Sequence, residues 1–185
     1  MAGGREFDRQ RFKELILFIA DQSKDDPRFG ISKLNKILYF ADFKAFGILG
    51  QSITGATYER RDFGPVPREM LAALHEMEDA GDINRTERHY LNQRQKVVQA
   101  LRPSRADELL DGREREIVSI ILDELRTRAE DQVRVLSSLN DMWQLANVGE
   151  EIPHEWAYIS TRKPSPTELK IAREQYAEFV AQRAG

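Results

Sequence analysis

Few residues in this 185-residue chain have the types and spacing that metal binding or acid–base chemistry requires. The densest titratable cluster is His75-Glu76-Met77-Glu78-Asp79, whose imidazole and carboxylates are groups that bind divalent metals or exchange protons. Neighbouring residues on a helix point in different directions, however, and His75 has no second histidine one helical turn away. We therefore interpret the cluster as a solvent-exposed helix face, and predict no catalytic residue, no metal site and no cofactor.

The composition argues against other chemistries. The chain has no cysteine, which excludes disulfides, thiolate nucleophiles and cysteine-bound zinc and suits a reducing cytoplasm. It contains no glycine-rich phosphate loop, no Gly-x-Ser-x-Gly elbow and no His-Glu-x-x-His pair. We predict that the protein is not an enzyme, and a site assembled from dispersed residues stays only as a third reading.

A basic cluster is the first candidate for binding. It consists of four basic residues between positions 85 and 96, in a predicted hairpin, and Glu87 is the only acidic residue among them. Such a cluster could contact DNA phosphates. The plainer alternative is that hairpin tips are exposed and polar in any protein. The preceding helix, residues 68–81, is acidic, which is unfavourable for reading a DNA groove, and the net charge of the chain is -3. The candidate DNA contacts are Arg85, Arg88, Arg94 and Lys96.

A second candidate surface surrounds the sequence Phe63-Gly64-Pro65-Val66-Pro67. A rigid turn flanked by arginine and an aromatic residue favours protein binding, because these side chains are common interface anchors and rigidity lowers the entropic cost of ordering. The alternative is that Phe63 and Pro65 fill the core beneath the second helix. The predicted partner-binding residues are Arg60, Arg61, Phe63, Pro65 and Trp143. Trp143 is included as the largest apolar anchor of residues 133–148.

Several helices and strands must position these residues. Apolar periodicity predicts a helix over residues 7–21 and a second that begins near Ser32 as its N-cap and has a very broad apolar face, so it belongs in the centre of a core. A short strand over residues 53–60, the Gly-Pro turn and a third helix with Pro67 in its first turn follow.

The second half of the chain begins with a predicted hairpin of residues 82–90 and 96–101. Further helices follow: one from Ser104 to Leu110, one around residues 117–125, and a region over 133–148; residues 150–160 read as irregular. The capping box Ser165-Pro166-Thr167-Glu168 begins a terminal helix. The fold class is α+β and mainly α-helical, with a short strand and a β-hairpin, and the first half is winged-helix-like in its topology.

Two motifs resemble a known family. The helix KLNKILYFAD at residues 33–42 and the Gly-Pro turn about twenty residues later are similar to the Panacea domain, the SocA-like antitoxin domain of bacterial toxin–antitoxin systems. A third similarity runs through residues 136–139, Trp143 and residues 151–153, with Asn140 or Asp141 where relatives tend to have histidine. The matching residues, which we interpret as structural, are Lys33, Leu34, Lys36, Leu38, Tyr39, Ala41, Gly64, Pro65 and Val66.

The resemblance implies a Panacea-like domain over residues 1–160. The capped C-terminal helix, residues 161–185, lies outside the resemblance, and we expect it to pack on the same domain. It implies a bacterial or phage-associated antitoxin that neutralises a cognate toxin by direct binding, in some relatives by presenting the toxin to a protease. The alternative is a winged-helix-like regulator that binds the DNA of its own operon. No apolar stretch approaches a membrane span, so we expect a cytoplasmic protein without a membrane partner; the oligomeric state stays open.

Overall fold

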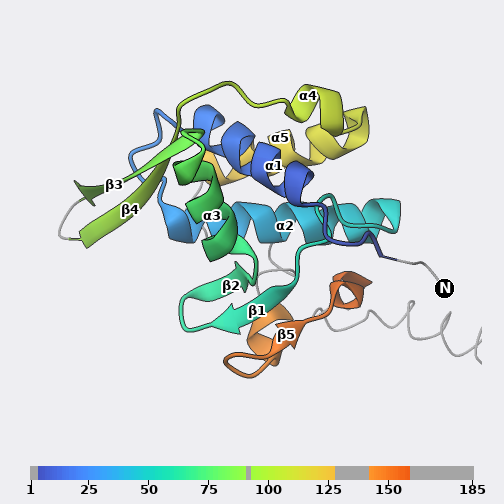
Figure 1. Ribbon diagram of the computed structural model, residues 1–185. Coiled ribbons are helices and arrows are strands. Elements are labelled where there is room, and N and C mark those ends of the chain that lie inside the picture. Colours follow the sequence, from blue (N-terminus) through green and yellow to red (C-terminus); the bar gives the residue numbers. More distant parts are fainter. Residues whose placement is uncertain (1–3, 91–92, 128–141, 159–185) are drawn as a thin grey trace, which may run out of the picture.

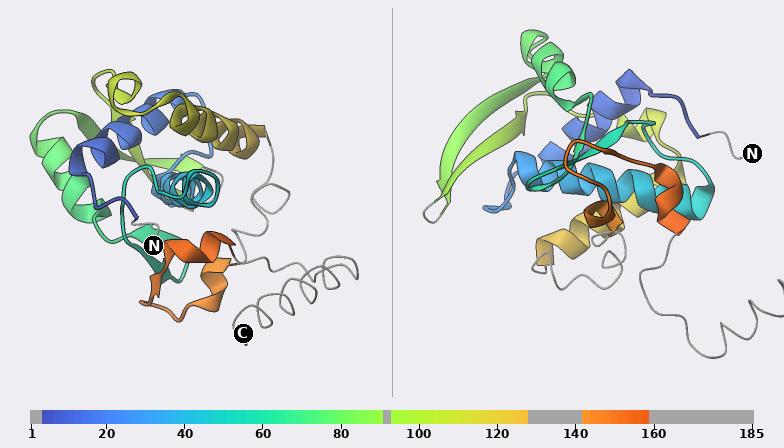
Figure 2. Two further views of the ribbon diagram at one scale, coloured as in Figure 1. Left: turned by 90° about the vertical axis from the view of Figure 1, so that its right-hand side faces the viewer. Right: turned by 90° about the horizontal axis from the view of Figure 1, so that it is seen from below.

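In a computed structural model, which describes residues 4–90, 93–127 and 142–158, the fold is mainly helical α+β, as the sequence predicts. Helix α2 (Ile31–Leu49) lies at its centre and contacts α1 (Arg9–Gln22) and α5 (Gly112–Thr127). Seen end-on in Figure 2, α2 has neighbouring elements on several sides. Most of its residues are buried, which explains why its apolar face is so broad. It begins one residue after Gly30, not at a Ser32 N-cap.

The start of α1 is fixed by its cap and by a close backbone contact. The Asp8 carboxylate accepts hydrogen bonds from the N–H groups of Gln10 and Arg11, both at 3.0 Å. Gly55 has a φ of +73° and lies against the chain before α1, where a Cβ atom would come within 2.4 Å of the Glu6 carbonyl oxygen. Only glycine fits this position, which holds the segment before α1 against the loop after α2.

A three-stranded antiparallel sheet of β1 (Tyr58–Arg61), β2 (Gly64–Pro67) and β5 (Glu151–Ile152) lies beside α2, in the order β2-β1-β5 (Figure 1). Residues 64–67 are therefore a strand, and our prediction of a turn there was wrong; the turn lies at residues 62–63. Arg68 N–H donates to the Thr57 carbonyl, so by alternation the prolines at 65 and 67 face away from β1. Proline has no N–H to donate and is tolerated on such an outer edge.

Helix α3 (Met70–Asp79) begins three residues after Pro67, which lies in β2 and not in the first helical turn. The predicted hairpin is confirmed as β3 (Ile83–Tyr90) and β4 (Gln93–Ala100), and its second strand begins three residues earlier than the sequence indicated. The short helix α4 (Ala106–Leu109) leads into α5. The Ser104 hydroxyl accepts a hydrogen bond from Ala106 N–H at 3.0 Å, in the manner of a cap.

The chain from residue 142 returns to the first half of the molecule. It contains two short 3-10 helices, η2 (Trp143–Leu145) and η3 (His154–Tyr158), with β5 between them. The region predicted as irregular thus adds a strand to the sheet and packs η3 on α2. Residues 136–141 and the predicted C-terminal helix lie outside the described residues. Within the described part, no helix has both the length and the apolar character needed to cross a bilayer.

Candidate partner-binding face

An open groove of about 700 Å³ lies between the β1–β2 strands, α3 and the β3–β4 hairpin; we call it the α3 groove. Its volume is within the range of about 300–1,000 Å³ that is typical of ligand pockets. Leu71 is 62% exposed in this groove, although it is a large apolar side chain. The apolar lining consists of Ile31, Val66, Pro67, Met70, Leu71 and Leu74, and the charged lining of Glu59, Arg61, Arg68, Glu78, Arg85, Glu87 and Lys96.

Ion pairs join several of the charged lining residues. Glu59 accepts hydrogen bonds from Arg68 Nε at 2.7 Å and from Arg61 Nη2 at 2.6 Å. The hydrogen bond from Arg68, together with the charges of both arginines, lowers the pKa of Glu59. Glu78 accepts from Arg85 Nε at 2.8 Å, and this hydrogen bond lowers the pKa of Glu78. The carboxylates therefore stay ionised and neutralise much of the positive charge of the groove. The apolar lining, by contrast, includes the solvent-exposed side chain of Leu71.

Asn35, in the first turns of α2, also lines the groove. Asn35 is only 7% exposed, and its Oδ1 atom has no hydrogen-bond partner among the described residues. An unpaired buried amide costs about 1–3 kcal/mol, since it loses water without gaining another partner. A ligand that supplied a donor here would remove that cost.

The predicted residues Arg60 and Trp143 contact each other. The Arg60 guanidinium lies 5.5 Å from the centroid of the Trp143 ring, a cation–π geometry. Arg60 Nη1 also donates to the carbonyls of Gln144, at 2.7 Å, and Ala146. Arg60 thus attaches η2 to β1, and it places Leu145, which is 59% exposed, beside the sheet.

The other three predicted partner-binding residues lie in different environments. Phe63, in the β1–β2 turn, is 88% exposed, more than any other large apolar side chain in the described part. Arg61 lines the groove, and Pro65 is buried. Gly149 N–H donates to the Arg60 carbonyl at 2.7 Å, which brings the exposed Val148 toward the same turn. Phe63 thus lies exposed in the turn between β1 and β2, two strands that contribute Arg61 and Val66 to the groove lining.

The structure does not keep the basic hairpin cluster together as a free surface. Arg88 Nη2 donates to three backbone carbonyls of the α1–α2 loop, those of residues 26, 27 and 29, at distances of 2.9, 2.9 and 2.6 Å. Arg85 pairs with Glu78. Arg94 and Lys96 are exposed. Two of the four predicted DNA contacts are thus used to hold the hairpin on the rest of the fold.

The family-motif residues of α2 lie mostly in the interior. Lys33 is buried, and its Nζ donates to Asp26 Oδ2 at 2.5 Å and to the Leu125 carbonyl at 2.8 Å. Burial alone would raise the pKa of Asp26, but the hydrogen bond and charge of Lys33 outweigh it, so that pKa is lowered. Lys36 is half-buried beside Gly64, where a Cβ atom would lie 3.6 Å from Lys36 Cε. The remaining buried motif residues are Leu34, Leu38, Tyr39, Ala41, Gly64 and Pro65, while Val66 lines the groove.

A buried polar cluster joins the first motif to the third. Asp42 is fully buried and accepts hydrogen bonds from Thr54 N–H and Tyr58 OH, both at 2.8 Å, and from the Thr54 hydroxyl. Burial raises the pKa of Asp42, although the charge of His154 and these hydrogen bonds act in the opposite direction. The His154 ring packs on Phe43 with 4.9 Å between centroids, and burial lowers the pKa of His154. The cluster holds η3 and β1 on α2.

Sequence reasoning missed four of these residues. Asp42 comes four positions after Leu38 on the apolar stripe of α2, so the period already indicated a buried carboxylate. His154 directly follows the third motif, which was another signal. Asn35 and Leu71 gave no such signal, because only packing decides whether an amide or a leucine lies in a groove. No group of three or more potential metal ligands occurs in the described part of the chain.

Comparison with known proteins agrees with the two motifs. The family model described as antitoxin SocA-like, Panacea domain, matches residues 34–144, which is more than half of the chain. The chain belongs to this family. No curated protein and no solved structure matches it significantly. Helix α1, β5 and η3 lie outside the matched residues although they pack against the same central helix or sheet.

Proposed function

We propose that this protein is an antitoxin that neutralises the product of a neighbouring toxin gene by binding it directly in the bacterial cytoplasm. The observation that carries the proposal is the exposure of large apolar side chains, Phe63 in the β1–β2 turn and Leu71 in the α3 groove, in a member of an antitoxin family. Exposed apolar groups gain free energy when a partner covers them, by about 25 cal/mol for each Å². Contiguous exposed apolar surface is typical of protein-binding sites.

The arrangement suits binding better than catalysis. Around the groove, Glu59 and Glu78 are paired with arginines, which lowers their pKa values and makes them poor proton donors near neutral pH. Phe63 offers the kind of aromatic anchor that dominates many interfaces, and the arginines Arg61 and Arg68 lie on the adjacent wall. Delivery of the toxin to a protease would be a later step that begins with the same complex.

DNA binding is the weaker candidate. Exposed Arg94 and Lys96 can neutralise only a few phosphates, and the carboxylates of helix α3, Glu76, Glu78 and Asp79, give it no positive charge to offer DNA. Contact with the operon would therefore be weak, dependent on salt and poor in sequence preference.

The test is expression of the adjacent gene with and without this protein, followed by co-purification. We expect the adjacent product to be toxic alone, harmless with the antitoxin, and bound to it. The variant Phe63→Ser should lose at least tenfold in affinity, and the matched control Ile48→Ser, at an exposed position at the far end of α2, should bind normally. A toxic neighbour that is neither bound nor neutralised would contradict the proposal for that pair.

A further inference from the structure

We propose that the α3 groove receives an extended segment of the toxin, which pairs with the free edge of β3 as an added strand. This proposal rests on the antitoxin function proposed above and names the form in which the partner is bound. Addition of a strand to an open sheet edge is a general mode of peptide recognition, in which backbone hydrogen bonds give affinity and side-chain pockets give selectivity.

The pairing of β3 with β4 shows which backbone groups are open. Leu101 N–H donates to the Asp82 carbonyl at 2.9 Å, so this opposed pair is hydrogen-bonded. Hydrogen-bonded and non-hydrogen-bonded pairs alternate along an antiparallel ladder. The backbone groups of Arg85, Glu87 and His89 therefore point away from β4. Arg85 is held at this edge by its side-chain ion pair with Glu78, and the Glu87 N–H and carbonyl are open groups beside the groove.

Consecutive residues Arg85, Thr86 and Glu87 all line the groove. Successive side chains of a strand point to opposite faces, so a cavity lined by three in a row is bordered by the edge of the strand. An added strand at this edge would lie between β3 and α3, with every second side chain directed at Leu71 and Val66. The added strand would turn the two-stranded β3–β4 sheet into a three-stranded sheet. Sheets of three or more strands are more stable than an isolated hairpin.

Hydrogen bonding favours the same occupant. Arg61 and Arg68 share the Glu59 carboxylate on the opposite wall, and their side chains are 58% and 54% exposed against 13% for Glu59. Arg68 also pairs with Glu151 at 3.2 Å, so two carboxylates balance the two arginines and this wall selects no charge in the segment. The unpaired Asn35 oxygen suits an N–H donor. We therefore expect a toxin segment with alternating apolar side chains and an N–H donor opposite Asn35.

The sharpest test compares two changes at one residue with the product of the adjacent gene. Glu87→Pro removes the open N–H without removing a hydrogen bond to β4, and Glu87→Ala removes only the side chain. We expect the proline variant to lose at least tenfold in affinity and the alanine variant less than threefold, with both retaining the β-sheet signal in circular dichroism. Equal affinity of the two variants would overturn the added-strand proposal.

Two further pairs keep the test independent of any effect of proline on folding. Leu71→Arg should lower affinity at least tenfold, while Leu101→Arg, at a similarly exposed leucine outside the groove, should not. Asn35→Leu should lower affinity without lowering the melting temperature, because it removes a buried amide oxygen that has no partner among the described residues. Normal binding by all groove variants, with loss in Phe63→Ser, would overturn the groove proposal and leave the antitoxin function intact.

If the adjacent product does not bind the wild-type protein, the proposed function fails and the groove is tested alone. The probe is then a displayed library of random 12-residue peptides. Enriched peptides with alternating apolar residues that bind Glu87→Ala and not Glu87→Pro would support the groove proposal. Absence of enrichment, or peptides indifferent to both Glu87 and Leu71, would overturn it.

Discussion

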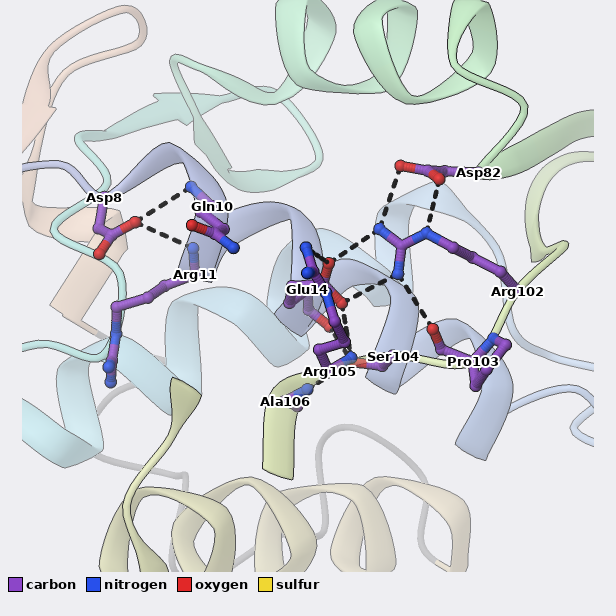
Figure 3. A network of polar contacts seen from close by, with 10 residues as sticks. All are labelled: Asp8, Gln10, Arg11, Glu14, Asp82, Arg102, Pro103, Ser104, Arg105 and Ala106. Atoms are coloured by element: carbon purple, nitrogen blue, oxygen red, sulfur yellow. Dashed lines mark hydrogen bonds and ion pairs between the residues drawn. The ribbon is translucent and has the colours of Figure 1, made fainter. Parts of the chain in front are cut away.

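Two faces of the molecule use similar residue types in opposite ways. One face, which we call the ionic face, lies where α1 meets the chain after β4 (Figure 3). There Glu14 is 2% exposed and accepts hydrogen bonds from Arg102 Nη2 at 2.8 Å and from Arg105 N–H at 2.7 Å. Arg102 also donates to Asp82 at 2.6 Å. At the α3 groove, by contrast, the Asn35 amide oxygen is unpaired and Leu71 is exposed.

The comparison indicates which face serves the fold and which is left for a partner. Burial alone would raise the pKa of Glu14, but the hydrogen bonds and charges of Arg102 and Arg105 outweigh it and lower that pKa. Hydrogen bonds to Glu14 and Asp82 raise the pKa of Arg102. A second buried carboxylate, Glu114, is held in the same way by Arg5 at 2.9 Å and by Arg11. The ionic face is satisfied internally, so its residues have little left to offer a toxin.

The largest expected effect breaks the ionic face. Arg102→Gln leaves Glu14 buried with much of its compensation removed, and removal of one member of a buried pair costs about 3 kcal/mol or more. Urea unfolding should show this loss, while toxin affinity at a temperature where the variant is folded should not change. Arg105→Gln is the control, because that side chain is 54% exposed and lies 3.5 Å from Glu14; it should cost less than about 0.5 kcal/mol.

A somewhat smaller effect concerns pH. The folded-state pKa of Glu14 lies below its ordinary value of 4.5, so its ionised form stabilises the fold above that pH. Glu14→Gln should therefore cost about 2 kcal/mol at pH 7, and the difference from the wild type should shrink as the pH falls below 4.5 and through the folded-state pKa. Unfolding curves between pH 7 and pH 3 measure it. A difference that stays constant with pH would mean that the charge of Glu14 contributes nothing.

Pro65 lies in β2, two of whose residues, Val66 and Pro67, line the α3 groove. Its replacement by alanine should lower the free energy of unfolding by about 1 kcal/mol, since the unfolded chain gains freedom, and should leave toxin binding unchanged because Pro65 is buried. Thermal melting and titration with the toxin measure both quantities. Unchanged melting with lost binding would instead place this residue in the interface.

The smallest effect sharpens the comparison at the hairpin. Arg94→Gln should weaken DNA affinity and change toxin affinity less than about threefold, because Arg94 lies outside the α3 groove and peripheral charges contribute little to affinity. Arg85 and Arg88 are kept, since they hold the hairpin on α3 and the α1–α2 loop. A tight, sequence-selective complex with the operon that survives physiological salt would make the regulator the better reading.

Much of the fold followed from periodicity and caps. The broad apolar stripe of α2 predicted its central position, and the alternation and polar loop of residues 82–101 predicted the hairpin. The Gly64–Pro67 strand was missed because two prolines argue against a strand, and only the pairing with β1 shows that both face an outer edge.

The site was less accessible to sequence reasoning. Phe63 and Arg61 could be proposed from residue type, but the grouping of Arg60 with Trp143 joins residues far apart in the chain. The open edge of β3 depends on hydrogen-bond parity, and the unpaired Asn35 depends on its neighbours in space. Neither leaves a pattern in the order of residues, since both arise only when α2, α3 and the hairpin come together.

Hydrogen exchange of this protein, alone and bound to the product of the adjacent gene, tests the central claim most directly. Exchange reports the protection of individual backbone amides, so it separates the two faces in one experiment. On binding, we expect the amides of Glu87 and of the turn around Phe63 to exchange more slowly. The amides of α1 around Glu14 should exchange at an unchanged rate. Protection of the ionic face with the α3 groove and Phe63 unchanged would contradict the account.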